Sequence, residues 1–272
     1  MPIGNVLLVV VGAWAGMSVL MTVMFIIGSR INNMGIVDAA WALGVGMLGI
    51  LYALLFDGAV MARMAVAVFA GAWGLRLGFH ILADRVIGRP EDGRYRALIE
   101  SWGSEARRRL FRFFQLQALF VVVFSLPFIP AALVPTNPQT WQFLAAAAIW
   151  CVAVLGESVA DRQLARWRNN PDNHGRTCRS GLWQYSRHPN YFCEWLHWWT
   201  YVALGIAAPH GWLTLIGPVL MLFFLYRVTG IPYTEKQAVA SRGDDYRQYQ
   251  QTVSAFFPWF PKQGINETTS TK

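Results

Sequence analysis

The stretch Trp141–Ala160, WQFLAAAAIWCVAVLGESVA, decides the class of fold. It is 20 residues long, and Glu157 is its only charged side chain. Because a helix needs about 20 mostly apolar residues to cross a bilayer, this stretch predicts a transmembrane helix. We therefore expect an all-α integral membrane protein with about seven transmembrane helices. The other six candidate spans are residues 5–27, 36–56, 61–83, 113–134, 191–208 and 211–229.

The composition of the whole chain supports this class of protein. Of the 272 residues, 55% are hydrophobic and only 14% are charged, whereas an average soluble domain has about 25% charged residues. This composition excludes a disordered protein and argues against a soluble enzyme. The three cysteines, Cys151, Cys178 and Cys193, match neither a disulfide framework nor a zinc site. We expect no metal.

The positive charges predict how the chain crosses the membrane. Nineteen of the 23 Lys and Arg residues lie in 84–111, 161–190 and 227–272. The positive-inside rule places these segments in the cytoplasm, with the N-terminus outside and the C-terminus inside. The first span has no basic residue before it, so we expect a retained helix rather than a signal peptide. For a bacterial chain the location is the cytoplasmic membrane.

The net charge of +8 has two possible explanations. The excess of basic residues either only sets the membrane topology or also attracts a polyanionic cofactor. No feature suggests nucleic acid as a partner; the expected partners are a lipophilic small molecule and membrane lipid. The cytoplasmic connections of about 30 residues are too short for a second core. We expect one membrane domain, residues 1–265, followed by a polar tail, residues 266–272.

Ionisable side chains within the predicted spans are functional candidates, because each is costly in a bilayer. Two of them, Arg76 and His80, are four residues apart and so share a helix face. A purely structural role is the alternative for two groups of these residues. The charged residues of the third span can form ion pairs between helices, and Asp161 with the arginines after it can form a solvated helix end. The candidates are Asp38, Arg76, His80, Asp84, Arg85, Glu157, Asp161, Glu194 and His197.

The strongest local pattern is Gly181–Glu194, GLWQYSRHPNYFCE. Pro189 suits the first turn of a helix, where its missing N–H is not needed. Arg176, Arg179 and Arg187 surround this expected helix start, and free N–H groups with flanking arginines bind anions. We therefore expect a phosphate-bearing cofactor here. The helix face is predicted to carry a polar stripe of Arg187, Asn190, Glu194, His197 and Trp198. His188 is either a cap or a cofactor contact.

The C-terminal region contains a second pattern. A polar helical part includes Glu235, Tyr246 and Tyr249, and an aromatic and proline-rich part follows in 256–261. The region is either an interfacial anchor or a segment that closes a cofactor site from the cytoplasm. The chain contains no GxGxxG, Walker or HExxH motif, which excludes a soluble type of nucleotide-binding domain.

The two patterns together resemble the C-terminal domain of the steroid 5-alpha reductase superfamily, closest to an uncharacterised bacterial branch. Isoprenylcysteine carboxyl methyltransferases and sterol C14-reductases share the same Gly-Leu turn, the Ser-Arg-His-Pro-Asn-Tyr segment and the closing Glu and Tyr residues. The resemblance covers 150–261 well and 36–100 more loosely. It implies an oxidoreductase of lipid metabolism, in which NADPH enters from the cytoplasm and gives a hydride to the C=C of a lipophilic enone.

The resemblance also implies roles for individual residues. Residues 36–100 would polarise the substrate carbonyl, and 141–262 would bind the cofactor. Asp38 looks like the catalytic carboxylate, and His80 substitutes for the family's Tyr, at whose position Trp73 stands. Glu157 stands where the family has Asn. The implied cofactor-binding residues are Arg76, Asp84, Arg85, Glu157, Asp161, Arg168, Arg179, Tyr185, Arg187, His188, Asn190, Tyr191, Glu194, Trp198, Glu235 and Tyr246.

The main alternative is a membrane methyltransferase that uses S-adenosylmethionine at the same cytoplasmic site. Arg187, His188, Asn190, Tyr191 and Glu235 would again lie near the ligand, and Ser-Arg-His-Pro-Asn-Tyr is closer to that branch. Against it stand the seven-helix layout and the charged third span, which suit a larger phosphate-bearing cofactor. A transporter or lipid-binding scaffold is a third class, but the chain shows no inverted repeat.

Overall fold

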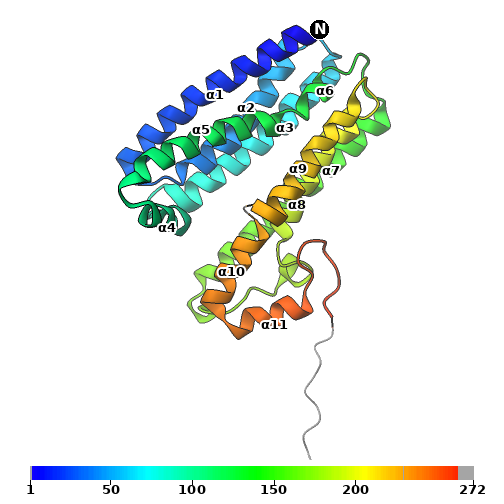
Figure 1. Cartoon of the computed structure of the whole chain (residues 1–272). Coiled ribbons are helices and arrows are strands. Elements are labelled where there is room, and N and C mark those ends of the chain that lie inside the picture. The colour runs from blue at the N-terminus through cyan, green and yellow to red at the C-terminus, as the bar shows by residue number, and fades with distance from the viewer. Residues whose placement is uncertain (1, 229, 263–272) are drawn as a thin grey trace, which may run out of the picture. The chain divides into compact units, whose positions relative to one another are not determined.

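The computed structural model describes residues 2–228 and 230–262. Within these residues all regular structure is helical, as the sequence predicts, and there is no strand. The chain forms two compact units (Figure 1). Unit 1 contains the residues up to Phe143 together with Tyr201–Gly217, and unit 2 contains Leu144–Thr200 and the described residues from Pro218 onward. The predicted tail, residues 266–272, lies outside the described residues.

Unit 1 is a bundle of long apolar helices. The α2 and α3 helices approach closely because small residues face each other. A Cβ atom on Gly46 would lie 2.8 Å from the carbonyl oxygen of Ala70 and 3.1 Å from the Cα atom of Gly74. Small residues of this kind are the usual contact between membrane helices. The elements are α1 (Ile3–Ile31), α2 (Ile36–Leu55), α3 (Val60–Ile81), the π-helical turn η1 (Leu82–Val86), α4 (Gly93–Trp102), η2 (Gly103–Glu105), α5 (Ala106–Ser125), α6 (Phe128–Ala132) and η5 (Gly211–Leu215).

Unit 2 is built around α7 and α8. The two helices pack tightly at Gly156, where a Cβ atom would lie 2.7 Å from the Sγ atom of Cys193. The polar C-terminal part forms two short helices, as the sequence predicts. The elements are α7 (Thr140–Asn169), which begins in unit 1, η3 (Pro171–Asn173), η4 (Gly181–Gln184), α8 (Pro189–Gly205), which ends in unit 1, α9 (Ile216–Phe223), the π-helical turn η6 (Phe224–Val228), α10 (Ile231–Arg242) and α11 (Asp244–Thr252).

All seven predicted spans overlap helices, and five helical segments are long and apolar enough to cross a membrane. These five are Ile3–Ile31, Ile36–Leu55, Val60–Val86, Thr140–Asn169 and Gly211–Arg242. The other two predicted spans fall on α5, which begins with a cluster of arginines, and on α8, which has 17 residues. The sidedness of the chain stays a prediction.

The structure differs from the prediction at three places. Residues 113–134 do not form one helix, because the chain breaks at Leu126 and Pro127 between α5 and α6, where proline lacks the N–H that a helix interior needs. The helix predicted over 141–160 continues to Asn169. The short helix α4 was not predicted, because its ten residues are polar and carry no long apolar stripe.

Candidate functional site

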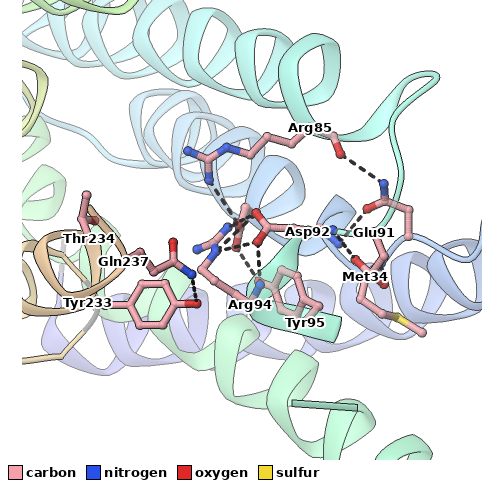
Figure 2. Close-up of polar contacts among 12 residues, drawn as sticks. Met34, Arg85, Glu91, Asp92, Arg94, Tyr95, Tyr233, Thr234 and Gln237 are labelled. Carbon is pink, nitrogen blue, oxygen red and sulfur yellow. Dashed lines mark hydrogen bonds and ion pairs between the residues drawn. The ribbon is translucent and has the colours of Figure 1, made fainter. Parts of the chain in front are cut away.

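Five of the predicted site residues lie in two clusters of polar side chains, one cluster in each unit. In unit 1 the Asp38 cluster consists of Asn33, Asp38, Arg85, Glu91, Asp92, Arg94 and Tyr95, and Figure 2 shows the labelled members of this set converging at one place. Asp38 lies in the first turn of α2. Its Oδ2 atom accepts a hydrogen bond from Arg94 Nη2 at 2.6 Å, and its Oδ1 atom accepts one from Tyr95 Oη at 2.8 Å. Arg85 Nη1 lies 3.9 Å from the same carboxylate.

The short helix α4 carries both of these donors, and Asp92 sets its start. Asp92 is the N-cap, and its Oδ1 atom accepts a hydrogen bond from the backbone N–H of Arg94 at 2.9 Å. The guanidinium of Arg94 also lies 2.9 Å from Asp92 Oδ2. A capping aspartate satisfies a backbone N–H that has no partner within the helix. Arg94 is therefore held between two carboxylates.

The charges of the cluster shift the pKa values of its members outside the spans. Burial lowers the pKa of Arg94, but the charge of Asp38 and the hydrogen bond to Asp92, together with weaker charge effects, outweigh burial, so the pKa lies above its usual value. Burial and then the charge of Asp38 raise the pKa of Tyr95 well above its usual value. Burial raises the pKa of Asp92, but hydrogen bonds from Arg94 outweigh it and lower the pKa. Tyr95 therefore stays a neutral donor and Arg94 stays a cation at neutral pH.

Asn33 and Glu91 brace the two loops beside Asp38. The side-chain N–H groups of Asn33 donate to the carbonyl oxygens of Arg85 at 3.1 Å and Arg89 at 3.3 Å. Glu91 Oε2 accepts a hydrogen bond from the backbone N–H of Met34 at 2.8 Å. The loop before α2 is thus tied to the segment after the π-helical turn. Turns of this type are frequent at functional sites.

The carboxylate of Asp38, the predicted catalytic group, is held by α4. In the described part of the chain Asp38 accepts hydrogen bonds from Arg94 and Tyr95, and its catalytic role stays a prediction. Arg85, which was predicted to bind the cofactor, lies beside Asp38 in the structure. The side chains of His80 and Asp84 are exposed, and Arg76 is half-buried.

In unit 2 the Glu235 cluster consists of Arg187, His188, Glu235 and Gln250. Glu235 Oε1 accepts a hydrogen bond from Arg187 Nε at 2.6 Å and lies 3.3 Å from His188 Nε2. Glu235 Oε2 accepts one from Gln250 Nε2 at 2.8 Å. Arg187 Nη1 also donates to the carbonyl oxygens of Gln250 and Val253, at 2.9 and 2.6 Å. One carboxylate therefore joins the segment before α8 to both C-terminal helices.

The start of α8 is closed by groups of the protein itself. Pro189 is its first residue, as predicted, and has no N–H. Ser186 Oγ accepts from the backbone N–H of His188 at 3.1 Å, and Asn190 Oδ1 accepts from that of Tyr191 at 3.0 Å. The backbone N–H groups of His188 and Tyr191 are therefore engaged within the protein. Arg187 precedes the helix, so its assignment to the stripe on the face of α8 was wrong.

Aromatic residues hold the C-terminal helices on the Gly181–Glu194 segment. Tyr249 Oη donates to the carbonyl oxygen of Trp183, and also to that of Ser186 at 3.3 Å. Burial raises the pKa of Tyr249. Burial, followed by the charge of Glu235, raises the pKa of Tyr246 to about 12. The C-terminal region thus packs on the predicted cofactor segment.

The remaining predicted residues of unit 2 lie on or near α7 and α8. Asn190 Nδ2 donates to Asp161 Oδ1 at 3.2 Å, which joins the two helices. Arg168 is exposed and lies near Arg242, whose guanidinium is 4.7 Å from the ring centroid of Tyr246. Tyr185 contacts Phe260, and Tyr191 pairs with Thr234 and stacks on His188. Glu157, Glu194, His197 and Trp198 are buried.

The six arginines of residues 161–190 fall into two groups. Arg179 and Arg187 form ion pairs with Asp245 and Glu235, at 3.0 and 2.6 Å. In the described part of unit 2 the others have no ion pair and are exposed: Arg162, Arg166, Arg168 and Arg176. Among these six, the second group is the one available to an external anion.

Sequence reasoning missed six members of the two clusters: Asn33, Glu91, Asp92, Arg94, Tyr95 and Gln250. A weak signal was present in Asp92-Gly93-Arg94, since an aspartate before a polar segment is a typical N-cap. That signal predicts a helix start but not its partner, because Arg94 and Asp38 are 56 positions apart.

Comparison with known proteins places the chain in a family. A family described as proteins of unknown function (DUF1295) matches residues 24–253. The chain is also similar to the "Uncharacterized protein C9.08c" of Schizosaccharomyces pombe, with 30% identity over 90 residues, which are 27% of this chain and 32% of that protein. The match thus spans about a third of the relative. No solved structure is significantly similar. Because the family match covers most of the two units described above, the chain belongs to the DUF1295 family.

Proposed function

We propose that this protein is a membrane-embedded, NADPH-dependent reductase of the steroid 5-alpha reductase superfamily, acting on the C=C of a lipophilic enone. The observation that carries the proposal is the group of exposed arginines without ion pairs in unit 2: Arg162, Arg166, Arg168 and Arg176. The resemblance of the Gly181–Glu194 and C-terminal segments to that superfamily supports the same reading.

The charge of the cofactor decides between the two candidate reactions. NADPH carries a pyrophosphate and a 2′-phosphate, whereas S-adenosylmethionine carries a sulfonium cation. Phosphate oxygens pair well with the planar guanidinium of arginine. Four uncompensated arginines at the end of α7 and in the following loop therefore suit the anionic cofactor and repel the cationic one.

The residues of unit 2 fit NADPH in part. Arg168 and Arg176 are the groups we assign to its phosphates, and Asp161 and Asn190 to its ribose hydroxyls. When bound, the cofactor supplies a hydride. Arg179 and Arg187 do not serve as phosphate ligands in this proposal; through their carboxylate partners they hold the C-terminal helices in place.

In unit 1 we propose that Tyr95, rather than His80, is the donor that works with Asp38. The phenol is buried and donates to Asp38 Oδ1 at 2.8 Å, while the side chain of His80 is exposed. A phenol can donate to a carbonyl oxygen as it does to a carboxylate. Arg85 and Arg94 beside it would stabilise negative charge on an enolate oxygen.

One observation favours the methyltransferase as the second candidate. Ser186 accepts a hydrogen bond from the backbone N–H of His188, just before α8, and Arg187 is paired with Glu235. These groups therefore offer no phosphate site, and a smaller cofactor without phosphates needs none. The Ser-Arg-His-Pro-Asn-Tyr segment, which is closer to that branch, agrees with this alternative.

We also propose seven membrane spans with the N-terminus outside and the C-terminus in the cytoplasm, within the cytoplasmic membrane of a bacterial cell. In this arrangement α5 and α8 are the two spans added to the five apolar segments. The 17 residues of α8 are near the lower limit for a span.

Cofactor binding tests the proposed function. The full chain in detergent is titrated with NADPH, NADH and S-adenosylmethionine by calorimetry. We expect NADPH to bind more tightly than NADH, and Arg168→Ala to weaken NADPH binding roughly ten-fold or more, as expected for loss of a charge-assisted hydrogen bond. The matched control Arg247→Ala, at an exposed arginine of α11, should bind NADPH like the wild type.

The same titrations distinguish the alternatives. Binding of S-adenosylmethionine without NADPH would overturn the reductase and support the methyltransferase. If neither compound binds to a folded protein, the clusters are structural and the enzyme proposal fails.

A further inference from the structure

The packing of α1 against α5 brings two basic segments together within unit 1. The ring of Phe25 lies 5.4 Å from those of Phe111 and Phe114, and Gln115 Nε2 donates to Thr22 Oγ1 at 3.1 Å. Because later residues of α1 meet earlier residues of α5, the two helices are antiparallel. The last turn of α1 therefore lies beside the first two turns of α5, at the end of unit 1 where Figure 1 shows α4.

Four exposed arginines lie at these helix ends, and we call them the basic collar: Arg30, Arg107, Arg108 and Arg112. None of the four has an ion pair in the described part of the chain. The nearby carboxylate of Glu105 is engaged by Arg109 at 3.4 Å, and the guanidinium of Arg109 lies 6.0 Å from the ring of Trp102. Within the described residues, the collar therefore carries four positive charges that form no ion pair.

Exposed apolar side chains begin within one turn of the collar on the same two helices. On α5 they are Leu116 and Leu119, each 43% exposed, and on α1 they are Val23 and Ile26, 44% and 45% exposed. With a rise of 1.5 Å per residue, Leu116 lies roughly 6 Å and Leu119 roughly 10 Å along the helix from Arg112. Cationic and apolar surfaces thus follow each other along the helix axes.

We propose that the basic collar and this apolar surface form a binding site for an anionic phospholipid. The arginines would hold the phosphate and the charged headgroup, and the apolar side chains would contact the acyl chains. Arginine clusters at the cytoplasmic ends of spans attract anionic lipids. A free phosphate would gain nothing from the apolar half, so the site selects the lipid. This inference does not depend on the proposed enzymatic function.

A lipid titration tests the site. The full chain in an uncharged detergent is titrated with short-chain phosphatidylglycerol, short-chain phosphatidylcholine or inorganic phosphate, and the midpoint of thermal unfolding is recorded. We expect phosphatidylglycerol to raise the midpoint, and the other two compounds to leave it nearly unchanged. At 1 M salt, where the Debye length is about 3 Å, the effect should shrink.

Matched variants locate the effect. The variant Arg107→Gln/Arg108→Gln/Arg112→Gln should bind phosphatidylglycerol more weakly, by roughly five-fold for each arginine. Arg30→Gln should weaken phosphatidylglycerol binding by roughly five-fold, because α1 contributes this one arginine to the site. The control Lys236→Gln/Arg247→Gln/Lys262→Gln removes the same charge from exposed positions of unit 2 and should behave like the wild type.

Three results would overturn the proposal. The first is wild-type binding by the α5 variant. The second is equal stabilisation by phosphatidylcholine, which would mean that charge is not recognised. The third is equal stabilisation by inorganic phosphate, which would mean that the site binds free anions. If the triple variant does not fold, Arg30→Gln carries the same decision.

Discussion

Asp38 in unit 1 and Glu235 in unit 2 each join segments that are far apart in the sequence, but they differ in the number of their partners and in their burial. Asp38 is held by Arg94 and Tyr95 of one short helix, and the side chains of its Arg94 pair are 32% and 19% exposed. Glu235 is held by three side chains from two segments, and the side chains of its Arg187 pair are 11% and 16% exposed. The more buried pair is the more costly to break, because a charge left without its partner then lacks solvent as well.

The comparison also changes how the motif residues are interpreted. Arg187 and Asp38 both attract attention as ionisable residues in apolar surroundings, and in the structure both are paired with other protein groups. Ionisable residues in a membrane protein therefore include ones that fasten loops to helix ends. The following four experiments test that conclusion, in order of decreasing expected effect.

The largest effect is expected from Glu235→Gln, which keeps the shape of the side chain and removes its charge. Arg187 would then be buried beside a neutral amide, and the free energy of unfolding should fall by about 3 kcal/mol. Thermal unfolding in detergent measures this loss, and the C-terminal helices should become more sensitive to protease. The control is Asp244→Asn, whose side chain is 95% exposed and pairs with Arg247. Equal effects of the two variants would contradict the central role of Glu235.

Asp38→Asn should have the next largest effect, about 2 kcal/mol, because charge-assisted hydrogen bonds are lost at a partly exposed site. A double-mutant cycle with Arg94→Gln should give a coupling energy of about 1 kcal/mol. If Asp38 served catalysis alone, Asp38→Asn would retain wild-type stability and the coupling would vanish.

Tyr95→Phe removes one hydrogen bond to Asp38 and leaves the ion pair with Arg94 in place. We expect a loss of about 1 kcal/mol in the free energy of unfolding. Tyr233→Phe is the control, since that hydroxyl is exposed and accepts from Gln237. For the proposed reductase, Tyr95→Phe should also lower enone-dependent NADPH oxidation without changing NADPH affinity. Unchanged turnover would remove Tyr95 from the proposed chemistry.

The smallest effect at neutral pH is expected from Tyr246, because its contribution to stability changes only at alkaline pH. The pKa of Tyr246 is raised to about 12 in the folded protein, whereas a free tyrosine has a pKa of about 10. Because the pKa of Tyr246 is higher in the folded protein than in the unfolded chain, the protonated phenol stabilises the fold. This contribution is complete below a pH of about 10 and is lost as the pH rises toward the pKa of the folded protein. Thermal midpoints measured across this range should fall with pH, and Tyr246→Phe should reduce the slope. The control Tyr233→Phe should leave the slope unchanged. An equal reduction of the slope by this control would mean that the effect does not originate at Tyr246.

Much of the fold follows from local properties of the sequence. Each long helix corresponds to an apolar stretch, and Pro189 and the polar segment after residue 230 mark helices that the structure contains. These features are local, since hydropathy and capping depend on neighbouring residues. Boundaries were less predictable: α7 runs nine residues past its predicted end because its polar extension contains no breaker before Asn170 and Pro171.

The candidate sites were predictable only in part. The sequence pointed to Glu235 and Arg187 through their place in recognisable segments, and to Asp38 through its cost in a membrane helix. It did not point to Tyr95 or Arg94, because nothing local distinguishes them from other residues of a polar loop.

The sequence by itself determined that this protein is helical, that most of its helices suit a bilayer and where its charges gather. Only the tertiary structure decided which charges are paired. The partners of Asp38 in α4 lie 56 and 57 positions away, and two of the three partners of Glu235 lie 47 and 48 positions upstream. The physical reason is that an ion pair depends on how helices pack, and the packing that separates paired arginines such as Arg187 from unpaired ones such as Arg168 is not a property of any single segment.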